Sequence, residues 1–388
     1  MDDFLSKLNE EQSQAVETTE GPVRVLAGAG SGKTRALISR YCYLVRDVGI
    51  SPQNILCVTF TNRAANEMKV RVRRQLGDQD LGYICTFHAF CTLLLHEDIH
   101  RLNFPKDFVI LDKEDWREIM LRIFSDMGLT LKETTVQRKI DEVLEGKKLQ
   151  ADTYVDYIYK LNNDELKEKW SQPGINQNQE IFLRFLYEQK KCFGVDFNDL
   201  INFATYILEN FPDVREKWQE RMQYVMVDEF QDVSLKQYRI AQILSAKHKN
   251  LFIVGDSDQT IYSWRGSHVR LILDFDKKYP TAKTILLNKN YRSTPQILKA
   301  ANTLISHNTV RYPKELEPTV ASGKKPVYYH AVSEEDESKW ICEKIKKLTK
   351  KNKRCDIAIL YRAHYLSRSL EEIFIKEDMP YRILAGTE

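Results

Sequence analysis

Four short apolar runs alternate with longer amphipathic stretches in the chain. Each run is apolar throughout, rather than at every second position, as is typical of parallel strands covered on both faces. The stretches between the runs have helical spacing. The pattern therefore predicts an α/β domain that binds ligands at the carboxyl ends of its strands. The runs cover residues 23–26, 55–58, 225–227 and 251–254.

Residues from about 92 to 195 show another pattern. They are rich in Lys, Glu, Leu and Tyr, with apolar positions at helical spacing and few strand signals. We interpret this stretch as a helical insertion into the α/β domain. A second α/β segment is predicted to begin near residue 281. It contains strand candidates at residues 284–287, 327–330 and 357–361, and a helix with a basic end at residues 334–354.

The first apolar run leads directly into a glycine-rich loop and then into a helical pattern. In this setting, backbone N–H groups of the loop cradle phosphate oxygens, and the helix N-terminus adds partial positive charge. Lys33 can reach the outer phosphates of a nucleotide, and Thr34 can hold Mg²⁺. The predicted phosphate-binding residues are Ala29, Gly30, Ser31, Gly32, Lys33 and Thr34.

Two acidic residues follow the apolar run at residues 225–227. Asp228 is the candidate magnesium-binding carboxylate, and Glu229 is the candidate general base for an attacking water. Acids that merely cap a strand are common. The phosphate loop upstream, and the extension of the pair to Asp-Glu-Phe-Gln-Asp, favour the catalytic interpretation.

The run at residues 251–254 ends in a segment that mixes two chemistries. Gln259 is an uncharged donor able to sense a γ-phosphate. A cluster of aromatic and cationic groups begins three residues later. Such groups stack on the bases of single-stranded nucleic acid. In isolation an aromatic cluster more often belongs to a core, but this one follows a nucleotide-sensing loop. The cluster comprises Tyr262, Trp264 and Arg265.

Two further strand ends carry residues suited to nucleic-acid contacts. Phe60, Thr61 and Asn62 follow one predicted strand, and His88 follows Thr86-Phe87 at the end of another. Hydroxyl, imidazole and backbone groups commonly position phosphates. For His88, a satisfied core histidine is an open alternative.

Composition narrows the class of protein. The 388 residues are 43% hydrophobic and 29% charged, and no apolar run is long enough to span a membrane. The seven cysteines form no CxxC pair, and we interpret them as buried, reduced thiols of a cytoplasmic protein.

The charge is distributed unevenly along the chain. Residues 281–388 carry 20 Lys and Arg against 13 Asp and Glu, a net charge of +7, which leaves −4 for the remainder. This basic part could face a polyanion, although a solvated lysine-rich helix is the commoner cause of such an excess.

Together these segments resemble the UvrD/Rep/PcrA family of superfamily 1A DNA helicases. The family's motifs occur in order along nearly the whole chain outside the helical stretch, beginning with residues 8–16, which match its adenine-reading Q motif. The Ala at position 27, where phosphate loops usually have Gly, is normal in this family. The remaining matches are residues 27–34 (motif I), 59–65 (Ia), 86–90 (Ib), 196–200, 228–232 (II), 255–266 (III), 290–293 (IV), and 361–362 with 367–372 (IVa).

The resemblance implies roles for residues that the pattern alone does not assign. It implies that Gln12 reads the adenine, that Tyr291 packs on it, and that Arg35 lies near the base or ribose. It implies that Arg292 is an arginine finger reaching the γ-phosphate from the second α/β domain, and that Phe197 stacks on DNA. The implied cofactors are ATP and Mg²⁺, and the implied partners are single-stranded DNA and single-strand/duplex junctions, bound by a monomer.

The implied architecture is a RecA-like P-loop NTPase sheet with a helical insertion, followed by a partial second RecA-like domain. Domain 1A would comprise residues 1–95 and 196–280, helical domain 1B residues 96–195, and domain 2A residues 281–388. The sequence has no segment like the family's domain 2B or motifs V and VI. We therefore expect an N-terminal portion of a 3′→5′ helicase, with weak ATPase activity and no processive unwinding. Two alternatives stay open: the helicase part of an AddA- or RecB-like helicase–nuclease, and an ATP- and DNA-binding module that does not translocate.

Overall fold

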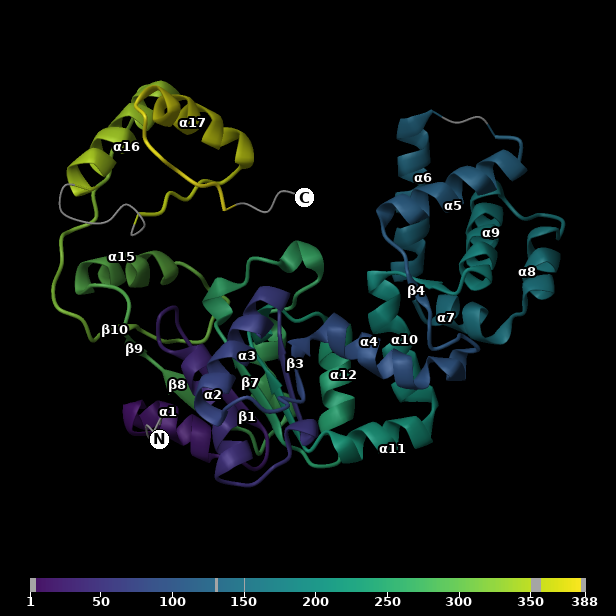
Figure 1. Ribbon diagram of the computed structural model, residues 1–388, viewed down its shortest axis with the longest axis horizontal. Helices are drawn as coiled ribbons and strands as arrows, with labels where there is room; N and C mark the ends of the chain where they lie inside the picture. The colour runs from purple at the N-terminus through teal and green to yellow at the C-terminus, as the bar shows by residue number, and fades with distance from the viewer. Residues whose placement is uncertain (1–4, 130–131, 150, 350–356, 385–388) are drawn as a thin grey trace. The chain divides into compact units, whose positions relative to one another are not determined.

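The computed structural model describes residues 5–129, 132–149, 151–349 and 357–384. The chain forms two compact units, Met1–Gly323 and Lys324–Glu388 (Figure 1). Within the described residues, no helix combines the length and apolar character needed to cross a bilayer.

A six-stranded parallel sheet forms the centre of the first unit (Figure 1). Its strand order is β3-β2-β6-β7-β1-β8, and every neighbouring pair is parallel. The four predicted apolar runs are confirmed as β1, β2, β6 and β7. The six strands are β1 (Val23–Ala27), β2 (Ile55–Thr59), β3 (Tyr83–Thr86), β6 (Tyr224–Val227), β7 (Leu251–Gly255) and β8 (Lys283–Leu287).

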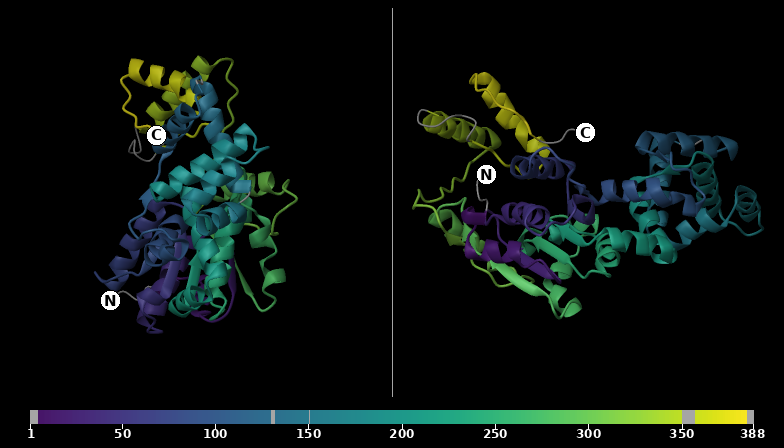
Figure 2. Two further views of the ribbon diagram at one scale, coloured as in Figure 1. Left: turned by 90° about the vertical axis from the view of Figure 1, so that its right-hand side faces the viewer. Right: turned by 60° about the horizontal axis from the view of Figure 1, so that its bottom comes forward.

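Both faces of the sheet are covered, which explains why its strands are apolar throughout. On β1, Val25 and Ala27 belong to the cluster that packs α1, α2 and α3 on one face, while Leu26 belongs to the cluster on the other face. Helices on both faces of the sheet are visible in Figure 2. The flanking helices are α1 (Glu10–Glu17), α2 (Lys33–Arg46) and α3 (Asn62–Leu76) on one face, and α4 (Phe87–Asp98), α10 (Phe197–Asn210), α11 (Pro212–Arg221) and α12 (Leu235–Ser245) on the other.

The strand predicted at residues 284–287 is confirmed as β8. The sequence pattern places it in a second α/β segment; in the structure it pairs with β1 of the central sheet, in register from Val23↔Lys283 to Ala27↔Leu287. Ile285 and Leu287 are buried in the core cluster around β1 and α2, which gives the pairing its apolar driving force. After β7, the same unit also contains α13 (Arg270–Leu273), α14 (Phe275–Lys278), β9 (Lys289–Asn290), α15 (Pro295–Ile305) and β10 (Glu317–Pro318).

In its described residues, the stretch predicted to be helical contains five α-helices that lie between α4 and α10 in the chain. Two-residue strands, β4 (Val109–Ile110) and β5 (Gly194–Val195), pair in parallel where the chain enters and leaves it. The sequence pattern found the helical content because each helix turns an apolar face to the shared core. The helices are α5 (Lys113–Asp126), α6 (Glu133–Leu149), α7 (Ala151–Lys160), α8 (Asn163–Trp170) and α9 (Gln177–Lys191).

A buried ion-pair network joins these helices to the start of α10. Lys147 Nζ lies 2.8 Å from Asp196 Oδ2 and 2.7 Å from Asp199 Oδ2, and the Lys147 side chain is only 2% exposed. Tyr154 donates to Asp199 Oδ1 at 2.7 Å, and Asp196 and Asp199 form the capping box of α10. Because Phe197 is the first residue of α10, the network fixes the place from which its ring projects.

Replacing Lys147 with methionine is expected to destabilise the fold by about 3–5 kcal/mol, because two buried carboxylates lose their counter-charge. Urea unfolding followed by circular dichroism measures the change. Lys160→Met is the control: Lys160 pairs with Asp156 on the surface, and its side chain is 59% exposed, so its loss should cost about 1 kcal/mol or less. Equal unfolding midpoints for the two variants would contradict this interpretation.

Two α-helices in the described part of the second unit share a small apolar cluster. α16 (Glu334–Thr349) and α17 (Ser367–Lys376) pack through Cys342, Ile345, Ile373 and Phe374. The strands predicted at residues 327–330 and 357–361 are wrong: the structure assigns neither as a strand. Tyr328 and Leu360 are 85% and 94% exposed, so these runs lack the burial that stabilises a strand. The end of the helix predicted at residues 334–354 lies outside the described residues.

The cysteines are mostly as expected. Among the described cysteines, five are buried and free, and burial raises the pKa of the Cys42 and Cys85 thiols to about 12. Cys192 is exposed, so its interpretation as a buried thiol is wrong; it is the residue directly after α9 and its neighbour Phe193 has φ +51°. Cys355 lies outside the described residues.

Candidate functional site

The phosphate loop has the predicted strand–loop–helix form, between β1 and α2. Gly30 and Gly32 take φ values of +71° and +88°, which disfavour other residues. A Cβ atom on Gly30 would lie 2.8 Å from Arg292 Cβ and from Asn290 Nδ2, and one on Gly32 would lie 2.4 Å from Gln12 Nε2. The loop therefore needs glycine at both positions, for backbone conformation and for space.

Gln12 holds this loop from the side of α1. Its side chain is buried and donates through Nε2 to the Ser31 carbonyl at 2.9 Å, while its Oε1 accepts from Asn9 N at 3.3 Å. Asn9 Nδ2 in turn donates to the Tyr291 hydroxyl at 2.8 Å. The residues predicted to contact adenine, Gln12 and Tyr291, are thus linked through Asn9. Arg35, predicted near the base or ribose, is exposed at the start of α2.

The ammonium of Lys33 meets the predicted general base. Lys33 Nζ lies 3.0 Å from Glu229 Oε2, which also accepts from Gln231 Nε2 at 2.9 Å. Glu229 has φ +47°, a left-handed conformation that costs a non-glycine residue about 1–3 kcal/mol and is common at functional sites. The strained backbone directs the Glu229 carboxylate toward the phosphate loop rather than along the strand.

Asp228 lies at the end of β6 and is buried. Within the described residues, its Oδ1 atom is buried without a hydrogen-bond partner. Burial, and then the Glu229 charge, raise the pKa of Asp228 to about 7. A buried carboxylate with an unfilled acceptor, on the same cavity as the Thr34 hydroxyl, fits a hard divalent cation that prefers oxygen ligands.

Thr34, Asp228 and Glu229 line a cavity of about 330 Å³ at the carboxyl ends of the strands. Within the described chain, Thr59 Oγ1 and Asp232 Oδ1 on its wall are also buried without partners. Burial and the Glu229 charge raise the pKa of Asp232 to about 6. The cavity is therefore suited to a polar, charged ligand. Its lining includes Thr34, Thr59, Phe60, Thr61, Asp228, Glu229, Gln231, Asp232, Gln259 and Tyr262.

Gln259 reaches the cavity from a 3₁₀ turn, Ser257–Gln259, after β7. Its Nε2 atom donates to Asp256 Oδ2 at 2.6 Å. The backbone N–H of Asp256 donates to Gln231 Oε1 at 2.9 Å, so the turn is tied to the Glu229 segment. Sequence reasoning gave no role to Asp256 or Gln231, because nothing in the local pattern marks either as a link.

Arg292 lies beside the phosphate loop. The family resemblance implies that it acts from the second α/β domain across a cleft; in the structure it belongs to the unit Met1–Gly323, which also holds the phosphate loop. Asn290 Nδ2 donates to the Ala29 carbonyl at 2.6 Å, and Tyr291 N donates to the Gly30 carbonyl at 2.9 Å. The physical cause is β8, whose pairing with β1 carries the following residues directly onto the loop.

The predicted DNA-binding aromatics form a row beside the cavity. Phe60 and Tyr262 stack with ring centroids 4.8 Å apart, and Trp264 follows 6.2 Å from Tyr262. Trp264 is 71% exposed, so the alternative that the cluster is core does not hold for its outer member. Thr61 and Asn62 are exposed at the start of α3, where Thr61 caps the helix by accepting from Ala64 N. The Arg265 side chain lies outside the described part.

A second aromatic contact lies at the start of α10. Phe197 is 60% exposed, and the His88 ring packs against its edge at 6.1 Å. His88 is half-buried, and burial lowers its pKa, which favours the neutral ring. The structure thus brings His88 and Phe197 together, although 109 positions separate them in the sequence.

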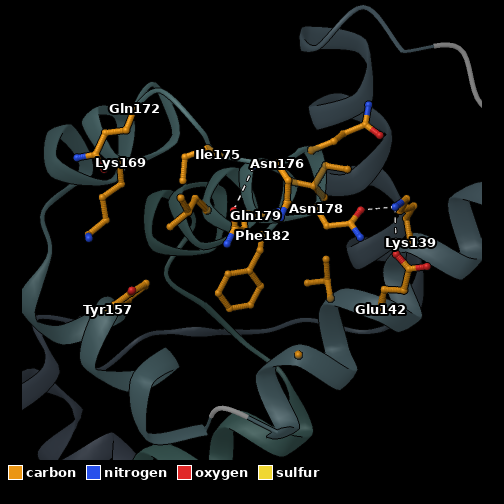
Figure 3. Close-up of a pocket in the computed structure, with 15 residues that line it drawn as sticks. Lys139, Glu142, Tyr157, Lys169, Gln172, Ile175, Asn176, Asn178, Gln179 and Phe182 are labelled. Atoms are coloured by element: carbon orange, nitrogen blue, oxygen red, sulfur yellow. Dashed lines mark hydrogen bonds and ion pairs between the residues drawn. The ribbon is translucent and has the colours of Figure 1, made fainter.

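A larger cavity, of about 740 Å³, lies among α6, α8 and α9, away from these residues (Figure 3). Phe182 and Tyr157 face it, and Lys139 contacts Asn178 and Glu142 at its rim. None of the predicted site residues line it.

Comparison with known proteins agrees with the geometry. Residues 8–280 match the UvrD/REP helicase N-terminal domain, and residues 285–388 match the UvrD-like helicase C-terminal domain. The chain is 39% identical over 393 residues to a protein of Staphylococcus aureus (strain Mu50) named ATP-dependent DNA helicase PcrA, covering 100% of this chain and 52% of that protein. It is 38% identical to a protein of the same name from Staphylococcus epidermidis (strain ATCC 12228), with the same coverage. The chain spans about half the length of the curated relatives it matches.

Proposed function

The chain belongs to the UvrD/REP helicase family, and from this premise we propose that it is the ATP-binding and single-strand-binding part of a 3′→5′ DNA helicase. One observation carries the proposal: Thr34 of the phosphate loop, the Asp228–Glu229 pair and the Phe60–Tyr262 stack all border one cavity, and Lys33 of the loop contacts Glu229. We propose single-stranded DNA next to a duplex as its substrate, bound by a monomer.

The residues of the cavity divide the work of ATP hydrolysis. The loop N–H groups and the Lys33 ammonium hold the β- and γ-phosphates, and Glu229 accepts the proton of the attacking water. Thr34 and Asp228 would hold Mg²⁺, which supplies positive charge against the phosphate oxygens when bound. Gln259 donates to the γ-phosphate, and Arg292, next to the loop, supplies a further positive charge.

Gln259 connects this chemistry to DNA. Tyr262 and Trp264 follow it within five residues, so a shift of the turn on γ-phosphate release moves the aromatic row. Bases stacked on Trp264 and on Phe197 would then leave these rings and stack on them again in alternation. The 3′→5′ direction rests on family membership alone.

Replacing Trp264 with alanine is expected to weaken binding of an oligo-dT strand by about 1–3 kcal/mol, roughly 5- to 150-fold in Kd, because one stacking surface is lost. Fluorescence anisotropy at several salt concentrations measures this, and the salt slope should stay the same because phosphate contacts are kept. Trp340→Ala is the control, since Trp340 stacks on Tyr329 in the unit Lys324–Glu388. If both variants bind as wild type does, Trp264 is not a DNA contact.

Because we expect no processive unwinding from residues 1–388 alone, the helicase proposal is tested with a polypeptide extended through motifs V and VI, by strand displacement on partial duplexes with a 3′ or a 5′ single-stranded tail. ATP-dependent displacement confined to the 3′-tailed substrate supports it, and displacement of the 5′-tailed substrate contradicts the direction. If ATP and DNA bind but no ATP-dependent movement along single strands occurs, the chain is a module that does not translocate.

A further inference from the structure

The segment of residues 311–319 crosses the nucleotide site without belonging to any recognised motif of the sequence. Its Leu316 side chain lies over the phosphate loop, where a Cβ on Gly28 would come within 2.2 Å of Leu316 Cδ2. β10 then pairs with β9, and Thr319 N donates to the Asn290 carbonyl at 3.0 Å. One end of the segment is therefore fixed to the loop and to the residues beside Arg292.

The other end of the segment is fixed to the γ-phosphate-sensing turn by ion pairs. Lys314 Nζ lies 2.6 Å from Asp256 Oδ1 and 2.7 Å from Asp258 Oδ2. Arg311 donates through Nε and Nη2 to the two Asp258 oxygens at 3.0 and 2.9 Å, a bidentate pair. Arg311 also donates to the Lys314 carbonyl at 3.0 Å, which fixes the two cations relative to each other.

This network is buried, unlike most ion pairs of the chain. The side chains of Lys314 and Asp256 are 3% and 4% exposed, and those of Asp258 and Arg311 are 10% and 14% exposed. Removing one charge from such a network leaves its partner desolvated and unpaired. The carboxylates of the turn thus depend on Lys314 and Arg311 for their place.

The network continues to the catalytic residues. One oxygen of the Asp256 carboxylate accepts a hydrogen bond from the Lys314 ammonium, and the other accepts one from the Gln259 amide. Asp256 N donates to Gln231, and Gln231 donates to Glu229, which contacts Lys33. A continuous path of hydrogen bonds and ion pairs therefore runs from Lys33 to Arg311.

We propose that Lys314 and Arg311 are positioning residues that hold the turn Ser257–Gln259, and with it Gln259, in register with the phosphate loop. Lys314 neutralises Asp256, so that its second oxygen can orient the Gln259 amide. Since the same turn leads into Tyr262 and Trp264, this anchor makes the DNA contacts respond to the bound nucleotide. The inference rests on the proposed function, because its test measures how bound nucleotide changes DNA binding. It adds two residues that link the nucleotide to the DNA contacts without touching the nucleotide.

The test measures coupling: the ratio of oligo-dT Kd values without and with saturating Mg²⁺ and a non-hydrolysable ATP analogue. We expect a ratio that differs from 1 by about 5-fold or more in the wild type. In Lys314→Met the ratio should fall to about 1, while the analogue's own Kd changes by less than about 3-fold, because Lys314 does not line the phosphate loop. Lys314→Arg, which keeps the charge, should restore part of the coupling.

Lys217→Met is the matched control, since Lys217 also pairs with two acids, Asp98 and Glu97, but away from the cavity. Wild-type coupling in Lys314→Met, or equal loss in Lys217→Met, would overturn the proposal. If Lys314→Met does not fold, Arg311→Lys carries the test, because it keeps the charge but loses the bidentate pair; wild-type coupling there also overturns it.

Hydrogen exchange without nucleotide separates this inference from the proposed function. Faster exchange at residues 256–266 in Lys314→Met, and not in Lys217→Met, supports the anchor even if the wild-type chain binds no nucleotide. Unchanged exchange at those residues overturns the anchor even if nucleotide binding is confirmed.

Discussion

Replacing Lys33 with alanine is expected to weaken ATP binding by about 2–5 kcal/mol, roughly 30-fold or more in Kd. The Lys33 ammonium is buried at the mouth of the phosphate loop, where low solvent exposure strengthens its attraction for phosphate oxygens. Its loss also leaves the Glu229 carboxylate without its cation, and this uncompensated negative charge would face the γ-phosphate. Isothermal titration calorimetry with Mg²⁺ and ATP measures the change.

Lys283→Ala is the control for Lys33. Lys283 begins β8 in the same sheet, and its ammonium donates to the Thr18 hydroxyl rather than lining the cavity. We expect its ATP affinity to equal that of the wild type. Lys33→Ala binding ATP as tightly as Lys283→Ala would exclude the loop as the phosphate site.

Replacing Glu229 with glutamine is expected to leave ATP binding nearly intact and to slow hydrolysis about 10²–10⁴-fold, the usual contribution of a general base. Glutamine keeps an oxygen that can accept from Lys33 and Gln231, so the geometry of the cavity persists, but it cannot take a proton. Single-turnover hydrolysis with radiolabelled ATP detects the difference even where wild-type turnover is slow.

Glu67→Gln provides the matched control for this substitution. Glu67 lines the same cavity, but it pairs with Arg71 on α3 rather than with Lys33. Its hydrolysis rate should stay close to that of the wild type. Equal rates in Glu229→Gln and in the wild type would assign the base to another residue.

The sequence predicted four strands of the sheet well, because buried parallel strands leave a local signal in the sequence. Wholly apolar runs revealed β1, β2, β6 and β7, and the residues directly after them carry the phosphate loop, Asp228 and Gln259. Parallel strands place their carboxyl ends on one edge, so these groups converge without any long-range information.

Pairing partners left no such signal. β8 was recognised as a strand, but not as the neighbour of β1, because an apolar run shows that a strand is buried and not against which strand. The exposed runs at residues 327–330 and 357–361 show the reverse error, since β-propensity without burial does not make a strand.

Buried charge was equally hidden in the sequence. Lys147 and Lys314 occur in polar, lysine-containing stretches that read as solvent-exposed surface, yet each lies buried between two carboxylates. Their partners, Asp196, Asp199, Asp256 and Asp258, are 49 to 58 positions away in the chain. Only the folded arrangement brings these charges together.

The most direct test of the account is the mutual effect of nucleotide and DNA on one another in the wild-type chain. By linkage, a bound Mg²⁺–ATP analogue must change the oligo-dT affinity by the same factor by which oligo-dT changes the analogue's affinity. We predict a factor of about 5 or more, measured independently by anisotropy and by calorimetry, and its absence in Lys33→Ala. Failure to bind the analogue, or oligo-dT affinities that are equal with and without it, would contradict a cavity shared by ATP hydrolysis and DNA contact.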